Sequence, residues 1–239
     1  MLAPSQQQDI ASVADAQRVR VLHRDYETRS RAILKSVGTH KYAADRSTQV
    51  LCCAFAVDDE PVQLWTPGDP IPAAFIEAVT NPTWVVCAHG AHFEDAIERH
   101  VLHPRFGWPA FPVDKQRCTQ AMALAVGLPA RLSTAAIALE LSNRKDVAGE
   151  RLMHQTSKPR RPHKDEDPSG IYWFEDQERL DRLYAYCQQD VEVERELYSR
   201  LPFVQPGRDC YRPQSSSASR FTAGTSKASG IRTRENVHF

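Results

Sequence analysis

The residues best suited to chemistry are a tyrosine and an aspartate in the segment LYAYCQQDV, residues 183–191. Tyr186 and Asp190 are four residues apart, and apolar residues recur around them at helical spacing, so both side chains would lie on one helix face. A phenol one turn from a carboxylate, at the edge of an apolar stripe, suits a metal site. The structural alternative is a tyrosine packed at the helix edge and an aspartate paired with a nearby arginine.

A second acidic motif is DYET, residues 25–28. If Asp25 and Glu27 lie on a strand, their side chains leave the same face, because strand side chains alternate. Two carboxylates so close repel each other, and a divalent cation relieves that repulsion directly. Oxygen ligands favour Mg²⁺ or Mn²⁺ over zinc. The alternative for this motif alone is a solvated strand end.

A third acidic motif is HFED, residues 92–95, which follows an apolar run typical of a strand. Glu94 would then lie in the first turn of a helix, where a carboxylate also gains from the helix dipole without any function. Phe93 and Ile97 mark the buried face of that helix. Since successive helix residues are about 100° apart, Glu94 is predicted to point inward and Asp95 outward.

The elements that must position these residues follow from the apolar patterns. We expect strands at residues 18–26, 49–57, 61–65 and 84–88, and helices at 71–79, 91–102, 119–126, 133–141 and 176–201. Strands gathered early, helices late and a strand-to-helix unit between them predict an α/β or α+β domain.

Changes in composition suggest the domain boundaries. Residues 1–18 are expected to be a polar leader and residues 19–202 the folded domain. Residues 144–170 are polar, charged and Pro-rich, which predicts a loop. Residues 203–239 are basic and rich in Ser and Gly, which predicts a disordered tail.

Composition limits the class of partner and the compartment. Among 239 residues, 30 Lys and Arg balance 30 Asp and Glu, so a nucleic acid would have to bind through local patches and metal. The six cysteines form no CxxC pair and lie mostly in apolar runs, which indicates buried thiols in a reducing compartment. The first residues do not resemble a secretory signal, and no apolar run approaches the roughly 20 residues of a membrane span. We therefore expect a cytoplasmic protein that does not bind membranes.

Taken together in chain order, the three motifs resemble a known family. The segments DYETRS (25–30), WVVCAHGAHFE (84–94) and LYAYCQQDVEVERELY (183–198) carry the likeness. Over residues 21–202 the chain resembles the tyrosine-type 3′–5′ exonuclease domains of the DEDD superfamily, and most closely the proofreading domain at the start of phage-like family A DNA polymerases. The resemblance implies a ribonuclease-H-like α/β fold, with a central mixed sheet flanked by helices.

The resemblance also implies a role for each candidate. Asp25 would bridge two Mg²⁺ or Mn²⁺ ions, with Glu27 and Asp190 completing one site and Glu94 holding the second ion mainly through water. Tyr186 would orient the attacking water, because a phenol with a pKa near 10 is a poor base at neutral pH. The expected reaction is hydrolysis of the terminal phosphodiester at a 3′ end.

The chain departs from the family pattern in its second motif. Gly90 stands where the wider superfamily often has asparagine, and Glu94 where it often has aspartate. Ala185 stands where the histidine-type members carry their histidine, so Tyr186 assigns the chain to the tyrosine type. The longer glutamate implies a slightly different metal geometry.

Substrate contacts are expected from five residues. Thr28 lies beside the first motif, and Phe93 could stack on a terminal base, although it would serve equally as helix core. Lys158, Arg160 and Arg161 belong to a basic loop that could bind the backbone of a single strand or remain solvated.

Three functions are compatible with these motifs. The leading one is an exonuclease acting on single-stranded DNA or a DNA 3′ end, with a separate polymerase as a further partner. The alternatives are an RNA 3′-end exonuclease like ribonuclease D, and an inactive nucleic-acid-binding remnant of a truncated polymerase. Four histidines around the second motif suggest zinc, but they are scattered around the predicted helix and therefore disfavour a zinc cluster.

Overall fold

A computed structural model of the protein describes residues 19–143 and 146–202. The predicted leader (1–18) and tail (203–239) lie outside these residues. The centre is a five-stranded sheet with the strand order β3-β2-β1-β4-β5. The strands are β1 (Arg20–Arg29), β2 (Gln49–Val57), β3 (Gln63–Trp65), β4 (Trp84–Ala88) and β5 (Gln116–Cys118).

The sheet is mixed, because β1, β2 and β3 pair antiparallel while β1, β4 and β5 pair parallel. This order and these directions make it a ribonuclease-H-like sheet, so the predicted fold class is confirmed. The central strand β1 is the longest and holds the first acidic motif, with Asp25 opposite Ala54 and Glu27 opposite Cys52 of β2.

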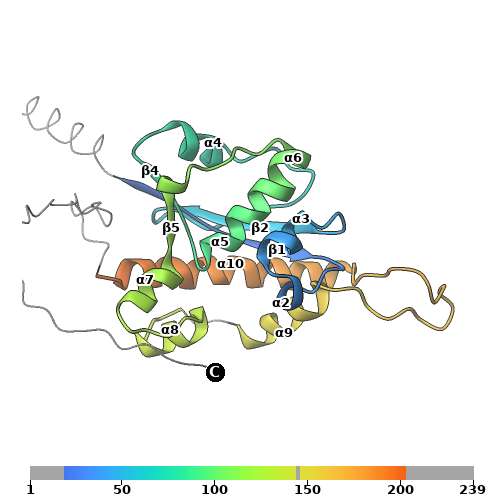
Figure 1. Ribbon diagram of the computed structural model, residues 1–239. Coiled ribbons are helices and arrows are strands. Elements are labelled where there is room, and N and C mark those ends of the chain that lie inside the picture. The colour runs from blue at the N-terminus through green and yellow to red at the C-terminus, as the bar shows by residue number, and fades with distance from the viewer. Residues whose placement is uncertain (1–18, 144–145, 203–239) are drawn as a thin grey trace, which may run out of the picture. The chain divides into compact units, whose positions relative to one another are not determined.

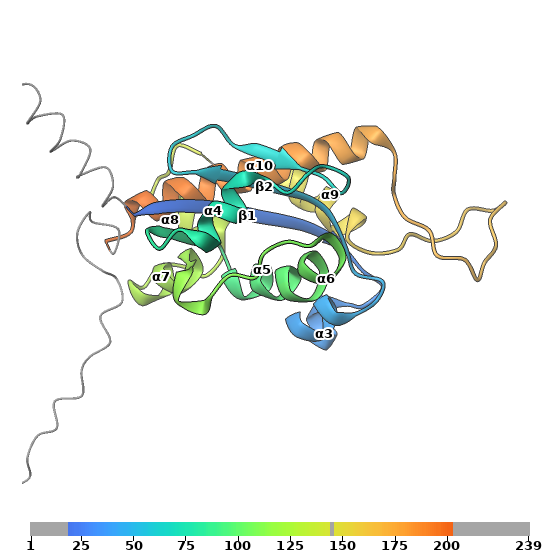
Figure 2. The ribbon, with the colours of Figure 1, turned by 90° about the horizontal axis from the view of Figure 1, so that it is seen from above.

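Helices cover both faces of the sheet. In Figure 2, α10 lies on one side of the strands while α5 and α6 lie on the other. The helices are α2 (Leu34–Val37), α3 (Thr39–Ala44), α4 (Ala73–Thr80), α5 (Ala91–Ile97), α6 (His103–Phe106), α7 (Thr119–Ala125), α8 (Leu132–Ala138), α9 (Val147–Thr156) and α10 (Gln177–Arg200) (Figure 1). A π-helical turn (Glu98–Leu102) joins α5 to α6, and a 3₁₀ turn (Val113–Lys115) precedes β5. Among the described residues, no helix is long and apolar enough to cross a membrane.

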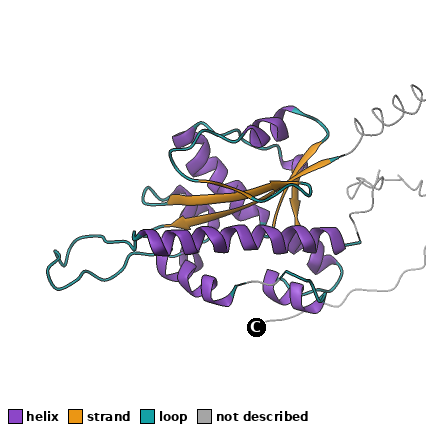
Figure 3. Ribbon diagram, turned by 180° about the vertical axis from the view of Figure 1, so that it is seen from behind, coloured by secondary structure: helices purple, strands orange, loops and turns teal. Residues whose placement is uncertain are grey.

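The two faces of the sheet are packed differently. Toward α4 and α5 the core contains large side chains, such as Tyr26, Phe75 and Trp108. Toward α10 the sheet presents small residues, including Cys52 and Ala54. Figure 3 shows α10 crossing this second face. Small side chains let the helix lie close to the strands, which places carboxylates of β1 and α10 within reach of one another.

Most predicted elements are confirmed. β2 and β4 have the predicted bounds, and α10 begins and ends within one residue of the predicted helix. β1 continues three residues beyond the predicted end, so Asp25 and Glu27 lie inside the strand. The helix of the second motif continues to Phe106 through the π-helical turn.

The predicted loop at residues 144–170 is wrong in its first half, where α9 forms. Asp146 caps this helix, its carboxylate accepting hydrogen bonds from the backbone of Ala148 (3.0 Å) and Gly149 (3.1 Å). An aspartate N-cap satisfies backbone donors that no helical carbonyl can reach. The helix is short, polar and contains glycine, so its sequence carries no strong periodic signal. The elements α2, α3 and β5 are also absent from the prediction, because they are too short to show a periodic apolar pattern.

A buried ion pair connects the sheet to the helix of the second motif. Arg24 is 1% exposed, and its Nε donates to Oε1 of Glu98 at 2.5 Å; Tyr26 donates to the same oxygen at 2.9 Å. Replacing Glu98 by Gln would leave the Arg24 cation buried without its counter-charge. We expect a loss of about 3 kcal/mol in the free energy of unfolding.

Denaturant titration checks this prediction against an exposed pair. Glu60 is half exposed and accepts from Arg20, so Glu60→Gln should cost less than about 1 kcal/mol. Equal effects of Glu98→Gln and Glu60→Gln would contradict the importance of the buried pair.

Candidate active site

The first two carboxylates lie between β1 and α10. Asp25 and Glu27 leave the same face of β1, and Cys187 of α10 donates its thiol to Oδ2 of Asp25 at 3.4 Å. One potential ligand atom from each of the three residues lies within 4.8 Å of the other two. The predicted strand alternation therefore holds, and it brings both acids to one place.

Tyr186 and Asp190 lie beside this pair. Both are buried, with exposed fractions of 1% and 6%. The pKa of the Tyr186 phenol is raised above its usual value, first by burial and then by the negative charges of Asp190, Glu27 and Asp25. The phenol thus lies in the field of three of the predicted acids.

Glu94 approaches from the opposite side of β1. Gly90 adopts the left-handed conformation (φ 100°) at the start of α5, which turns the chain sharply from β4 into the helix. Glu94 is 3% exposed, and its Oε2 has no hydrogen-bond partner among the described residues. Burial raises the pKa of the Glu94 carboxyl well above its usual range, and the nearby Asp25 charge raises it further.

Asp95 points away from this cluster, as the sequence predicts. Both of its carboxylate oxygens accept from Nε of Arg99 at 2.8 Å, one helical turn along. This exposed pair and the buried Glu94 define the register of the helix. The structure therefore brings together Asp25, Glu27, Glu94, Tyr186 and Asp190 from β1, α5 and α10.

Thr28 and Phe93 lie near one another through Tyr42. The hydroxyls of Thr28 and Tyr42 are 2.9 Å apart, and the rings of Tyr42 and Phe93 are 6.1 Å apart. Thr28 is 6% exposed, while Phe93 is half-buried and packs against the core. Phe93 thus serves the core and still presents part of its ring to solvent.

The three predicted cations of the basic loop differ in their surroundings. Arg160 makes two hydrogen bonds of 2.6 Å to Glu166 and lies over the ring of Tyr172, so its charge serves the loop itself. Lys158 and Arg161 are exposed.

Sequence reasoning missed a polar cluster behind the acids. Nδ1 of His23 and Oε2 of Glu194 are 2.6 Å apart, and Cys87 donates its thiol to Oε1 of Glu194 at 3.1 Å. All three residues are buried. The signal was present in the spacing: His23 stands two residues before Asp25 on the same strand face, and Glu194 one turn after Asp190 on α10.

This cluster predicts a pH dependence of stability. Burial alone would raise the pKa of Glu194, but the His23 charge and the hydrogen bonds from His23 and Cys87 outweigh it and hold that pKa below its usual 4.5. A lowered folded-state pKa adds stability above the unfolded-state pKa, and this stability is lost as pH falls through the lowered value. The difference in unfolding free energy between the wild type and Glu194→Gln should therefore shrink below about pH 4.5, the usual value. Urea titrations at several pH values measure it, and a difference that is constant with pH would contradict the prediction.

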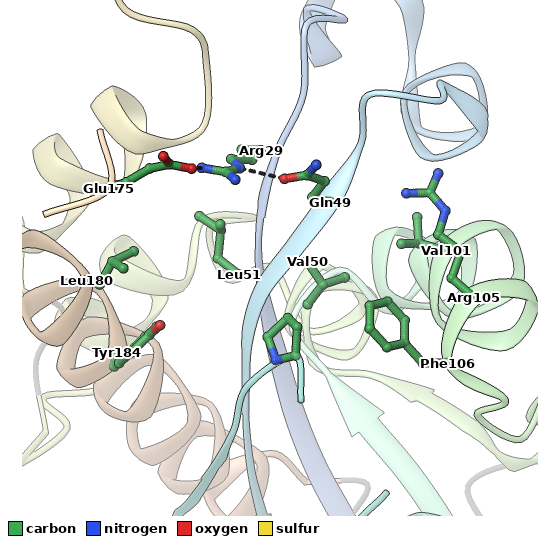
Figure 4. A pocket seen from close by; sticks show the side chains of 11 residues that line it. Arg29, Gln49, Val50, Leu51, Val101, Arg105, Phe106, Glu175, Leu180 and Tyr184 are labelled. Carbon is green, nitrogen blue, oxygen red and sulfur yellow. Dashed lines mark hydrogen bonds and ion pairs between the residues drawn. The ribbon is translucent and has the colours of Figure 1, made fainter. Parts of the chain in front are cut away.

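A pocket of about 400 Å³ lies elsewhere, around the first residues of β2. Figure 4 shows Leu180 and Tyr184 of α10 on one side of the strand and Phe106 on the other. Arg29 also lines this pocket and donates hydrogen bonds of 2.8 Å to Gln49 and Glu175. None of the five gathered residues lines this pocket.

The histidines of the second motif form no metal group within the described part of the chain. His89 lies within hydrogen-bonding distance of Thr119 and of the carbonyl of Ala130, and His103 contacts the carbonyl of Trp108. These contacts account for the positions of two of the four histidines without a zinc ion.

Comparison with known proteins supports the resemblance found in the motifs. No family model matches the chain. The DNA polymerase of Bacillus phage SP02 is 33% identical over 191 residues, which cover 79% of this chain and 29% of the polymerase. The chain thus spans less than a third of that relative's length.

Solved structures with a similar arrangement include two nucleases. Brucella melitensis NrnC is 12% identical, with a TM-score of 0.44 and coverage of 79% of this chain and 76% of NrnC. Escherichia coli RNase D, described as an exoribonuclease involved in structured RNA processing, is 17% identical, with a TM-score of 0.41 and coverage of 82% and 45%.

The strand order and directions define a ribonuclease-H-like domain. The phage polymerase relative confirms the resemblance to the DEDD-superfamily exonuclease domains of such polymerases.

Proposed function

We propose that the protein is a metal-dependent 3′–5′ exonuclease that hydrolyses DNA from its 3′ end. The observation that carries this proposal is the convergence of four carboxylates and one phenol from β1, α5 and α10. The preference for DNA is supported by the phage relative, which is a DNA polymerase. We also propose a single-stranded 3′ end as the substrate and a separate polymerase as a partner.

The cluster fits divalent cations. Its donors are carboxylate oxygens, which suit Mg²⁺ and Mn²⁺. The buried Oε2 of Glu94 has no hydrogen-bond partner among the described residues, and a bound cation would supply one. We propose that Asp25, Glu27, Glu94 and Asp190 hold two such ions. When bound, the ions would lower the pKa of a water molecule and neutralise charge on the phosphate.

The protein groups then orient the reactants. Because its pKa is raised, the Tyr186 phenol stays protonated at neutral pH and acts as a hydrogen-bond donor or acceptor, not as a base. We propose that it positions the attacking water for in-line displacement. Phe93, which is half-buried and precedes Glu94 on α5, would stack on the terminal base. Thr28, Lys158 and Arg161 remain candidates for backbone contacts, whereas the charge of Arg160 is taken up by Glu166.

A nuclease assay on the purified chain tests the proposal. The substrates are linear single strands of DNA and RNA that have the same sequence and a label at the 5′ end. Each is incubated with Mg²⁺ or Mn²⁺, and control reactions also contain a chelator. We expect stepwise shortening of DNA from the 3′ end that stops with the chelator. Faster cleavage of RNA would overturn the DNA preference, and internal cuts in circular single strands would overturn the exonuclease assignment.

A further inference from the structure

The backbone of α9 lies directly against the ring of Tyr186. Gly149 is buried there, and a Cβ atom built on it would lie 2.9 Å from Cβ of Tyr186, 2.9 Å from Oδ2 of Asp146, and closer still to Cδ2 of the Tyr186 ring. Carbon atoms in proteins essentially never approach so closely, so position 149 has room for glycine alone unless Tyr186 moves.

Contacts at both ends hold α9 in this place. At its start, Asp146 caps the helix and forms an ion pair with Arg182, one turn before Tyr186 on α10. At its end, the carbonyl of Ser157 accepts from the backbone of Ser30, just beyond β1. The helix therefore reaches from α10 to the end of the strand that carries Asp25.

Glycine is a poor choice for helix stability alone. It ranks far below alanine as a helix former, and α9 is a short helix that would gain from a better residue. The close approach to Tyr186 explains the glycine, because a backbone lying so near the ring leaves the side chain of Tyr186 few orientations.

We propose that α9 forms the wall that orients the Tyr186 phenol, and that Gly149 is a positioning residue for it. This inference rests on the proposed nuclease function. The ring lies against Gly149, and its hydroxyl is in the field of Asp190, Glu27 and Asp25. A methyl group at position 149 would push the phenol out of this orientation without removing any charged group.

The test is a double-mutant cycle between Gly149→Ala and Tyr186→Phe, with single-turnover cleavage of a 5′-labelled DNA strand as the readout. Gly149→Ala should lower the maximal rate by about 10²-fold, as expected for a misplaced catalytic group, with little change in the apparent dissociation constant for DNA. In the Tyr186→Phe background it should cause no further loss, since no hydroxyl remains to misplace. The matched control is Ala148→Gly, which weakens the same helix at an exposed position and should leave the rate unchanged.

Two outcomes would overturn the inference. One is a full rate for Gly149→Ala, and the other is an equal loss in the Tyr and Phe backgrounds, which would show a merely structural role. If Gly149→Ala does not fold, Gly149→Ala/Tyr186→Gly, which lacks both the ring and Cβ of residue 186, should fold as well as Tyr186→Gly alone; failure to do so would also overturn it.

A second readout does not depend on activity. In protein with isotope-labelled tyrosine rings, the Tyr186 resonances are identified by their absence in Tyr186→Phe. They should shift in Gly149→Ala and not in Ala148→Gly, and unmoved resonances would overturn the inference. A wild-type chain without nuclease activity would count against the proposed function, while the ring resonances would still decide whether Gly149 orients Tyr186.

Discussion

Glu94→Gln should lower metal-dependent cleavage by about 10²–10³-fold, the usual effect of losing one preorganised electrostatic contact. The same change should raise the melting temperature of the metal-free protein. The Glu94 carboxylate is buried, lies near the Asp25 charge and has an oxygen without a hydrogen-bond partner among the described residues. An amide of the same shape removes the charge without opening a cavity, so loss of rate and gain of stability have one cause.

The sign of the pH effect follows from the raised pKa. The folded protein binds the Glu94 proton more tightly than the unfolded chain, so this group lowers stability increasingly as pH rises above the usual glutamate value of 4.5. The stability gained by Glu94→Gln should therefore be small at pH 4 and larger at pH 7. Thermal melts in chelator at both pH values measure it.

Asp95→Asn is the matched control. Asp95 neighbours Glu94 but pairs with Arg99 at the surface, so its amide variant should keep the rate and change stability by less than about 1 kcal/mol. If Asp95→Asn abolishes cleavage while Glu94→Gln does not, the metal-ligand assignment must move to Asp95.

The sequence was sufficient where a local pattern decides the outcome. β2 and β4 are continuous apolar runs bounded by polar residues, so both of their ends were predictable. Asp25 and Glu27 share one face because strand side chains repeat every two residues. Tyr186 and Asp190 share one face because they are about one helical turn apart. The choice of Glu94 over Asp95 needed only the buried face of α5.

The sequence was insufficient where packing between distant segments decides. α9 has a weak apolar pattern and contains Gly149. The reason for a glycine there is the close approach to Tyr186 of α10, which the sequence does not show. Cys187 looked like an ordinary apolar position, yet its thiol meets Asp25 across the sheet–helix interface. Arg160 looked free to bind a phosphate, but Glu166 six residues later takes up its charge.

Asp25→Asn and Asp190→Asn should each reduce cleavage by about 10³-fold or more, and the double variant should be hardly slower than either one. Residues that act as a unit lose their joint effect when one of them is removed, so their losses do not multiply. Asp25 and Asp190 qualify as such a unit because both charges act on the Tyr186 phenol, from β1 and from α10. In the proposed site they also hold the same ion.

Single-turnover rates of the two single variants and the double variant measure this non-additivity, and Mn²⁺ titration by calorimetry provides a readout independent of cleavage. Asp181→Asn is the matched control, since Asp181 lies on the same helix as Asp190 but is exposed and accepts a hydrogen bond from Gln177. It should keep both the rate and the Mn²⁺ binding. If the losses of Asp25→Asn and Asp190→Asn multiply, the two carboxylates act independently, and the shared-ion assignment is wrong. If both variants bind Mn²⁺ like the wild type but do not cleave, the acids act on the substrate or the water and not as ligands, because an amide at either ligand position would weaken binding of a divalent cation.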